Sequence, residues 1–243
     1  MLIKYIRKIK RKIFGKQNAD NIKIDTLSSF ERGENVKLRN VTIELSGNSK
    51  LILKNNVDIS DYDIYIENSV VSIGENCILN KGYSAMRPRI IVSNKSRLDI
   101  SANNLLRCTF WLRFGGVCKL GEYNGICEDT EIRCDESVEI GNYNMISYQC
   151  MIYDTNTHTI YPKEKRRLMT KADYPYIGNE IEKPKTAAVM IGDDCWLGKR
   201  AVILKGTMLK TEVIVATSAV VSNLKVYASA VLAGNPAVVK ERR

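Results

Sequence analysis

One stretch near the C-terminal end constrains the fold more than any other part of the chain. Within residues 191–222, aliphatic residues recur at every sixth position without a break. Smaller residues stand two positions before each of them and keep the same spacing. The aliphatic positions are Ile191, Leu197, Ile203, Leu209, Val215 and Val221, and the smaller residues are Val189, Cys195, Ala201, Thr207, Val213 and Ala219.

A period of six excludes an α-helix and fits an extended chain. A helix with about 3.6 residues per turn would scatter these aliphatic residues around its surface. Six is a multiple of two, so in an extended chain all of them can point to the same side. We therefore predict a parallel β-helix, in which a turn about every six residues folds the chain into coils with three short faces. Six matched positions in phase argue against the alternative, a run of buried strands in an α/β domain.

Less regular repeats extend the predicted β-helix towards the N-terminus. The corresponding aliphatic residues are Leu53, Ile73, Ile100, Leu120, Ile140 and Ile191. Three of the intervals are 20 residues, close to one coil of three hexapeptides. A longer interval predicts a protruding loop near residues 81–89, and the longest predicts an inserted loop over 153–188. We expect a polar linker over 17–31 and the β-helix over 32–240, with Gly234-Asn235-Pro236 turning the chain out of the coil.

The first sixteen residues hold seven of the ten net positive charges. Apolar residues at 2, 6, 9 and 13 form one stripe, so we predict a basic amphipathic helix over residues 1–16. Such a helix is suited to an anionic membrane surface, with a cap on the coil or an oligomer contact as the alternative. Few aromatic residues accompany the charges, which argues against nucleic acid as a partner. Deletion of residues 1–16 tests the membrane interpretation, which fails if binding to anionic vesicles is unchanged.

The cysteines and the hydropathy pattern restrict the class of protein further. The seven cysteines are odd in number and include no CxxC pair, which is typical of reduced core thiols and argues against a structural zinc site. No apolar run approaches the roughly 20 residues of a membrane span. We therefore expect a cytoplasmic protein, with peripheral contact to the inner face of the cell membrane through residues 1–16.

The single histidine, His158, stands where the predicted insertion begins, in the sequence YDTNTHTIYP. Histidine has an unperturbed pKa suited to proton transfer near neutral pH. Asp154 and Asn156 are close in sequence, and either is a candidate to orient the imidazole through its second nitrogen. One histidine cannot supply the three-histidine zinc site of a carbonic anhydrase, and we expect no metal.

The motifs IGDDCWLGKRAVILKG, VIVATSAVVS and AGNPA, preceded by D-x-N-x-H, resemble the hexapeptide-repeat acyltransferases. Within that superfamily they are most similar to sugar O-acetyltransferases of the maltose, galactoside and polysaccharide type. The resemblance is close over residues 135–240 and extends as repeats over 32–134. It implies an all-β fold with left-handed coils, an exception to the usual right-handed crossover. It also implies a homotrimer with active sites between subunits, acetyl-CoA in the groove of the coil, and a histidine general base acting on a sugar hydroxyl.

The resemblance assigns roles to particular residues. His158 falls on the catalytic histidine, Trp196 on the tryptophan beside the cofactor groove, and Gly198 and Lys199 on the groove wall. Four further positions match residues that contact pantetheine and phosphates: Thr217, Ser218, Ser222 and Asn223.

The sequence also departs from the family pattern. Residues 216–219 lack the usual Gly-x-Gly-Ser character, and basic residues are common where Asn223 and Val238 stand. The basic residues that are candidates to make the phosphate contacts instead are Lys205, Lys225, Lys240, Arg242 and Arg243. Cys127 stands near the place of a family asparagine, and the neighbouring Glu128 and Asp129 are candidates to bind acceptor hydroxyls.

These features predict an acetyl-CoA-dependent O-acetyltransferase acting on a sugar hydroxyl of a bacterial surface polysaccharide, such as a capsule or O-antigen, or its precursor. Two alternatives stay open: an N-acetyltransferase on an amino sugar or a small molecule such as serine or a xenobiotic, and a non-catalytic trimeric scaffold of a polysaccharide-synthesis complex. Residues 159–188 are expected to select the carbohydrate acceptor.

Overall fold

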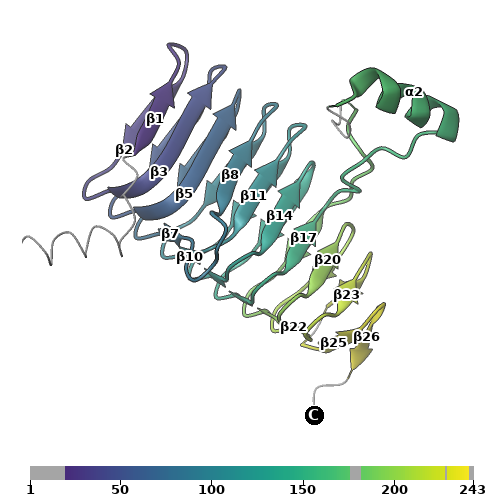
Figure 1. The fold of residues 1–243 in the computed structure, drawn as a ribbon. Helices are drawn as coiled ribbons and strands as arrows, with labels where there is room; N and C mark the ends of the chain where they lie inside the picture. The colour runs from purple at the N-terminus through teal and green to yellow at the C-terminus, as the bar shows by residue number, and fades with distance from the viewer. Residues whose placement is uncertain (1–19, 176–181, 228, 241–243) are drawn as a thin grey trace, which may run out of the picture.

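The protein is one continuous coil of short strands, stacked along a single axis (Figure 1). The computed structural model describes residues 20–175, 182–227 and 229–240, so the helix predicted over residues 1–16 lies outside the described residues. Almost all neighbouring strands are parallel, which confirms the predicted all-β parallel β-helix. Within the described ranges, no helix is long and apolar enough to cross a membrane.

The strands form three faces. The first face contains β7 (Ile78–Asn80), β10 (Leu105–Leu106), β13 (Gly125–Ile126), β16 (Met145–Ile146), β19 (Trp196–Leu197), β22 (Ile214–Val215) and β25 (Val231–Gly234). The second face contains β8 (Arg89–Val92), β11 (Thr109–Leu112), β14 (Glu131–Cys134), β17 (Met151–Tyr153), β20 (Val202–Leu204) and β23 (Val220–Val221). The third face is a nine-stranded sheet of β2 (Ser29–Arg32), β4 (Lys50–Leu53), β6 (Val70–Ile73), β9 (Arg97–Ile100), β12 (Val117–Leu120), β15 (Ser137–Ile140), β18 (Val189–Ile191), β21 (Met208–Leu209) and β24 (Lys225–Val226).

The inward side chains form one apolar core behind all three faces. Strands of successive coils pair in register, so that Leu105 lies beside Gly125 and Trp196 lies beside Ile214. All twelve positions of the six-residue repeat between residues 189 and 221 are at most 1% exposed. The period of six therefore marks the side chains that point inward, as the sequence predicts.

Both ends of the coil differ from the expectation. β1 (Asn21–Ile24) pairs with β3 (Lys37–Ser46) and β2 pairs with β4, so the coil begins inside the stretch expected to be a linker over residues 17–31. The side chains of β1 are all exposed, and an outermost strand therefore needs no apolar repeat. At the other end the chain turns at Gly234, where φ is 101°. It does not leave the coil there, because β26 (Ala237–Lys240) pairs antiparallel with β25.

A ladder of buried asparagines runs along one corner. Asn104 Oδ1 accepts a hydrogen bond from the Asn124 backbone at 2.8 Å, and Asn124 Oδ1 accepts one from the Asn144 backbone at 2.9 Å. Asn144 Oδ1 then accepts from the Cys195 backbone at 2.8 Å. Buried polar groups need such partners, so these asparagines are structural side chains rather than solvated turn residues.

The predicted insertion leaves the coil after β17 and returns at β18. Its two arms pair at the base, where Thr155 and Thr186 form an antiparallel bridge and the Asn156 N–H donates to the Lys185 carbonyl at 3.0 Å. Farther out stands α2 (Lys163–Asp173), which has no buried residue and projects away from the coil (Figure 1). This helix was not predicted, because its sequence KEKRRLMTKAD carries too few apolar residues for a helical stripe.

Candidate active site

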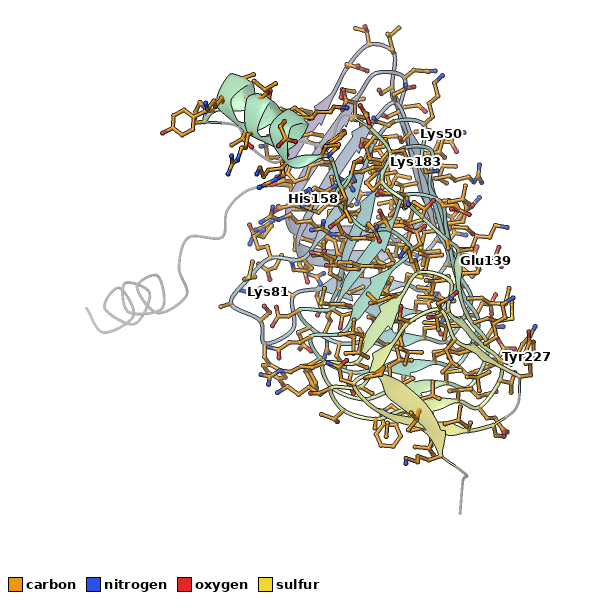
Figure 2. The ribbon with its side chains drawn as sticks, turned by 90° about the vertical axis from the view of Figure 1, so that its right-hand side faces the viewer. Lys50, Lys81, Glu139, His158, Lys183 and Tyr227 are labelled. Atoms are coloured by element: carbon orange, nitrogen blue, oxygen red, sulfur yellow. The ribbon has the colours of Figure 1, made fainter. Side chains whose placement is uncertain are left out.

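His158 lies on the arm that begins where β17 ends, near the base of the arm (Figure 2). Its side chain is exposed. Its backbone N–H donates to the Asn156 carbonyl at 2.7 Å, and the preceding Thr157 has a positive φ of 62°. The histidine is therefore presented on a tight turn that starts from a rigid strand.

A largely buried network of charged and polar side chains holds this turn against the coil. The Arg113 guanidinium donates to both carboxylate oxygens of Asp135, at 3.0 and 2.8 Å, and to the Thr157 carbonyl at 3.3 Å. Thr155 Oγ1 donates to the same carboxylate at 2.7 Å and accepts from the Thr157 N–H at 3.0 Å. Asp135 is fully buried, and a bidentate pair of this kind is geometrically specific. The network therefore holds the residue that precedes His158.

Sequence reasoning missed Arg113, Asp135 and Thr155. Asp135 is separated from Arg113 by 22 residues and from Thr155 by 20, which is about one coil in each direction. An arginine and an acidic residue separated in the sequence by the length of one coil can be predicted to form an ion pair once that length is known. The sequence gives no sign that this pair is turned inward.

The structure gives Asp154 a role other than orienting the imidazole. Its side chain is fully buried, and its carboxylate accepts hydrogen bonds from the backbone N–H groups of Asp135, Glu136 and Ser137 at 2.7–2.8 Å. Burial raises the pKa of the Asp154 carboxyl, and the three N–H donors oppose that shift. Asp154 thus clamps a corner of the coil. In the described part of the chain the Asn156 side chain makes no hydrogen bond, to His158 included, so its orienting role stays a prediction.

Trp196 lies on the first face, beside a shallow groove of about 340 Å³. It belongs to a line of outward apolar side chains in register, here named the apolar row: Ile78, Leu105, Met145, Trp196 and Ile214. Trp196 is 47% exposed and Met145 is 62% exposed. The groove also contains Cys127, whose thiol pKa is raised by burial.

Four of the residues expected to bind the cofactor gather at the corner between β19 and β20. The Ser218 N–H donates to the Lys199 carbonyl at 2.9 Å, which places Thr217 and Ser218 directly beside Lys199 on the next coil. Gly198 is required there, because a Cβ would lie 2.7 Å from the Thr217 nitrogen. Lys199, Thr217 and Ser218 are exposed and face solvent at this corner.

The remaining expected residues are divided between two places. Lys240 pairs with Val231 on the first face, in the same lateral register as Ile214 and Trp196. Ser222 and Asn223 lie one corner farther, after β23, where the Asn223 N–H donates to the Lys205 carbonyl at 3.3 Å. The structure therefore groups Lys240 with Trp196 and separates both from Ser222 and Asn223.

His158 and Trp196 are not brought together within one chain. Trp196 lies on the first face, and β20 of the second face follows it. Tyr153 pairs with Leu204 at the far end of β20, and His158 lies beyond Tyr153. A whole strand of the second face therefore separates the two residues along the chain path.

The cysteines and the acidic residues are the remaining side chains that can bind a metal ion. All seven cysteines are free thiols, and six of them are buried. Among the described residues, no group of three or more His, Cys, Asp and Glu side chains is placed to hold a metal ion.

Comparison with known proteins agrees with this architecture. Residues 188–222 match the family model described as a hexapeptide repeat of succinyl-transferase. The polySia specific acetyltransferase NeuO has a similar fold, with a TM-score of 0.60 and 17% identity over 93% of this chain and 82% of that one. The Arabidopsis UDP-N-acetylglucosamine acyltransferase gives a TM-score of 0.56 and 15% identity over 91% of this chain and 72% of that one. The chain therefore has a left-handed parallel β-helix fold, and its residues 188–222 match the hexapeptide repeat.

Proposed function

We propose that the protein is an acetyl-CoA-dependent O-acetyltransferase that modifies a sugar hydroxyl of a surface polysaccharide or its precursor. The observation that carries this proposal is the fixed presentation of the only histidine. His158 is exposed on a turn that Arg113 holds through the Thr157 carbonyl. The similarity of the fold to an acetyltransferase acting on polySia and to an acyltransferase acting on a sugar nucleotide supports the same class of reaction.

In the proposed reaction His158 is the general base. Its unprotonated ring nitrogen accepts the proton of the sugar hydroxyl while the hydroxyl oxygen attacks the acetyl carbonyl carbon. The C–O ester bond forms, the C–S bond breaks, and His158 returns the proton to the departing sulfur. Asn156 is the candidate to fix the ring orientation, and Arg113 positions the turn.

The first face has the chemical character that acetyl-CoA requires. Acetyl-CoA supplies the acetyl group as a thioester at the end of a long arm that carries phosphates at its other end. The groove beside Trp196 is mainly apolar, and Lys199, Thr217, Ser218 and Lys240 place cations and hydroxyls nearby. These residues would hold the co-substrate, with Ser222 and Asn223 at the more distant corner.

We further propose that the active site forms between copies of the chain in a homotrimer. Exposed apolar side chains grouped on one face mark interaction surfaces, and the apolar row is such a group, with Gly125 between Leu105 and Met145. A strand of the second face separates His158 from Trp196 within one chain. A neighbouring copy is therefore needed to complete a site that contains both residues. Residues 1–16 would hold this trimer at the inner surface of the cell membrane.

The first experiment compares the wild type with His158→Ala. Calorimetry should show that both bind acetyl-CoA, and thiol release with a panel of sugar acceptors should fall by about 10²–10⁴-fold in the variant. Turnover that survives in His158→Ala would favour the scaffold alternative, and absence of acetyl-CoA binding in both proteins would reject the donor. Mild base distinguishes the products, because it removes O-acetyl esters and leaves N-acetyl amides.

A further inference from the structure

A second cavity lies on the second face and shares Arg107 of its lining with the Trp196 groove. It has a volume of about 290 Å³ and is lined by the loop between β7 and β8 together with outward side chains of β8, β11 and β14. The loop, which contains Lys81, stands out from the coil (Figure 2). It is fastened to a later coil, because Ser84 Oγ donates to Asp129 at 2.6 Å and the Tyr83 N–H donates to Glu128 at 3.1 Å. This side of the cavity is therefore a fixed wall.

Three arginines line this cavity, and their charges are not equally compensated. Arg87 is paired with Asp63 at 2.7 Å, and Arg107 with Glu128 at 3.4 Å. Arg89 has no hydrogen bond or ion pair from its guanidinium to any residue in the described ranges. The buried Nε of Arg87 also lacks a hydrogen-bond partner there. The cavity thus offers Arg89, a cation without an ion-pair partner among the described residues, which suits an anionic group.

The two acidic residues of the lining are already engaged. Asp129 accepts the hydrogen bond from Ser84, and Glu131 accepts from Arg133 and from the Tyr153 hydroxyl, each at 2.5 Å. Neither carboxylate forms an ion pair with the Arg89 guanidinium among the described residues. Trp111 supplies a large apolar wall, and the Arg133 guanidinium lies 4.3 Å from the centroid of its ring. An apolar wall beside a free cation is suited to a sugar ring that carries a carboxylate.

The cavity is connected to the turn that carries His158 by two short contacts. The Arg113 guanidinium lies 5.8 Å from the centroid of the Trp111 ring and donates to the Thr157 carbonyl at 3.3 Å. In parallel, Trp111, Arg133 and Tyr153 occupy one line across three neighbouring strands. Strands are about 4.8 Å apart, so this line covers roughly 10 Å. A chain of sugars can span that distance, whereas a single sugar occupies only one end.

We propose that this cavity binds an acidic sugar of the acceptor through Arg89, so that the acceptor is an anionic oligosaccharide or polysaccharide chain. This inference rests on the proposed function for the reaction at His158. The acidic sugar sits against Trp111, its carboxylate pairs with Arg89, and another sugar of the same chain reaches His158.

The test measures binding without acetyl-CoA, so that it is independent of turnover. Calorimetry on the full chain uses tetrasaccharides of galacturonic acid, hyaluronan and sialic acid, each beside its carboxyl-reduced counterpart. At least one acidic tetramer should bind, and its reduced form should bind at least tenfold more weakly. Arg89→Gln should weaken binding of the acidic tetramer by about tenfold or more, the effect of losing one charge-assisted contact.

Arg97→Gln is the matched control. Arg97 is an exposed arginine on the third face, paired with Asp99 at 2.6 Å, and it lies outside the cavity. Its substitution should leave binding unchanged. The proposal is overturned if none of the three acidic tetramers binds, if the reduced forms bind equally well, or if both arginine variants behave alike. His158→Ala should keep the binding and lose turnover, which separates failure of the cavity from failure of the reaction.

Discussion

The first and second faces of the coil rest on the same kind of interior and present different exteriors. Inward residues on both faces are apolar and at most 1% exposed, as Leu106 and Ile152 illustrate. Outward residues on the first face form the apolar row, whereas those on the second face include Trp111, Arg133 and Tyr153. One repeat can therefore build two surfaces with unrelated chemistry.

This difference separates the residues that specify the fold from those that specify partners. Because side chains alternate along a strand, an outward residue can change without disturbing the core. The apolar row is suited to another protein surface, and the arginine-containing face to a polar ligand. The comparison predicts that equal substitutions on the two faces have unequal consequences.

The largest expected effect comes from placing a charge in the apolar row. Met145 on the first face and Met151 on the second are both outward methionines of the coil. Met145→Glu should dissociate the proposed trimer, because an unpaired charge buried in an interface costs at least about 4 kcal/mol, roughly a thousandfold in dissociation constant. Met151→Glu should leave the mass in sedimentation unchanged. Equal behaviour of the two variants would break the comparison between the faces.

The interior was predictable from the sequence, and the exterior only in part. The period of six located Ile191, Leu197 and the other inward residues because burial restricts residue type at every coil. Polar residues follow no such period, so the sequence did not show that Arg113 and Asp135 form a pair turned inward. Asp154 illustrates the limit most clearly. Its position next to His158 suggests chemistry, and only its burial against three backbone N–H groups reveals a structural role.

Asp154 and Asn156, which both follow the strand β17 of the second face, give the next prediction. Asp154→Ala should lower the free energy of unfolding by about 3 kcal/mol, because three backbone donors lose their acceptor. Asn156→Ala should change the free energy of unfolding by less than about 0.5 kcal/mol, because the Asn156 side chain has no hydrogen-bond partner in the described residues. It should lower kcat, because we propose that Asn156 orients the His158 ring. Urea denaturation and initial rates distinguish the two. A stable, slow Asp154→Ala enzyme would reverse the roles assigned here.

The smallest effect tests whether the interior behind both faces is continuous and dry. Cys108 joins β10 of the first face to β11 of the second and is fully buried. Burial raises the pKa of its thiol, so the thiol stays protonated in the folded chain while the unfolded thiol ionises above about pH 8.5. Stability from this group is therefore complete below that pH and is lost as the pH rises further.

Cys108→Ala removes that pH dependence. The difference in unfolding free energy between the wild type and Cys108→Ala should change by about 2 kcal/mol between pH 8 and pH 10, with the wild type losing more. Comparing the two proteins at each pH cancels the titration of tyrosines and lysines that they share. A difference that stays constant across this range would mean that water reaches Cys108. Water would then enter the corner between the first and second faces, and the two faces would not share one dry core.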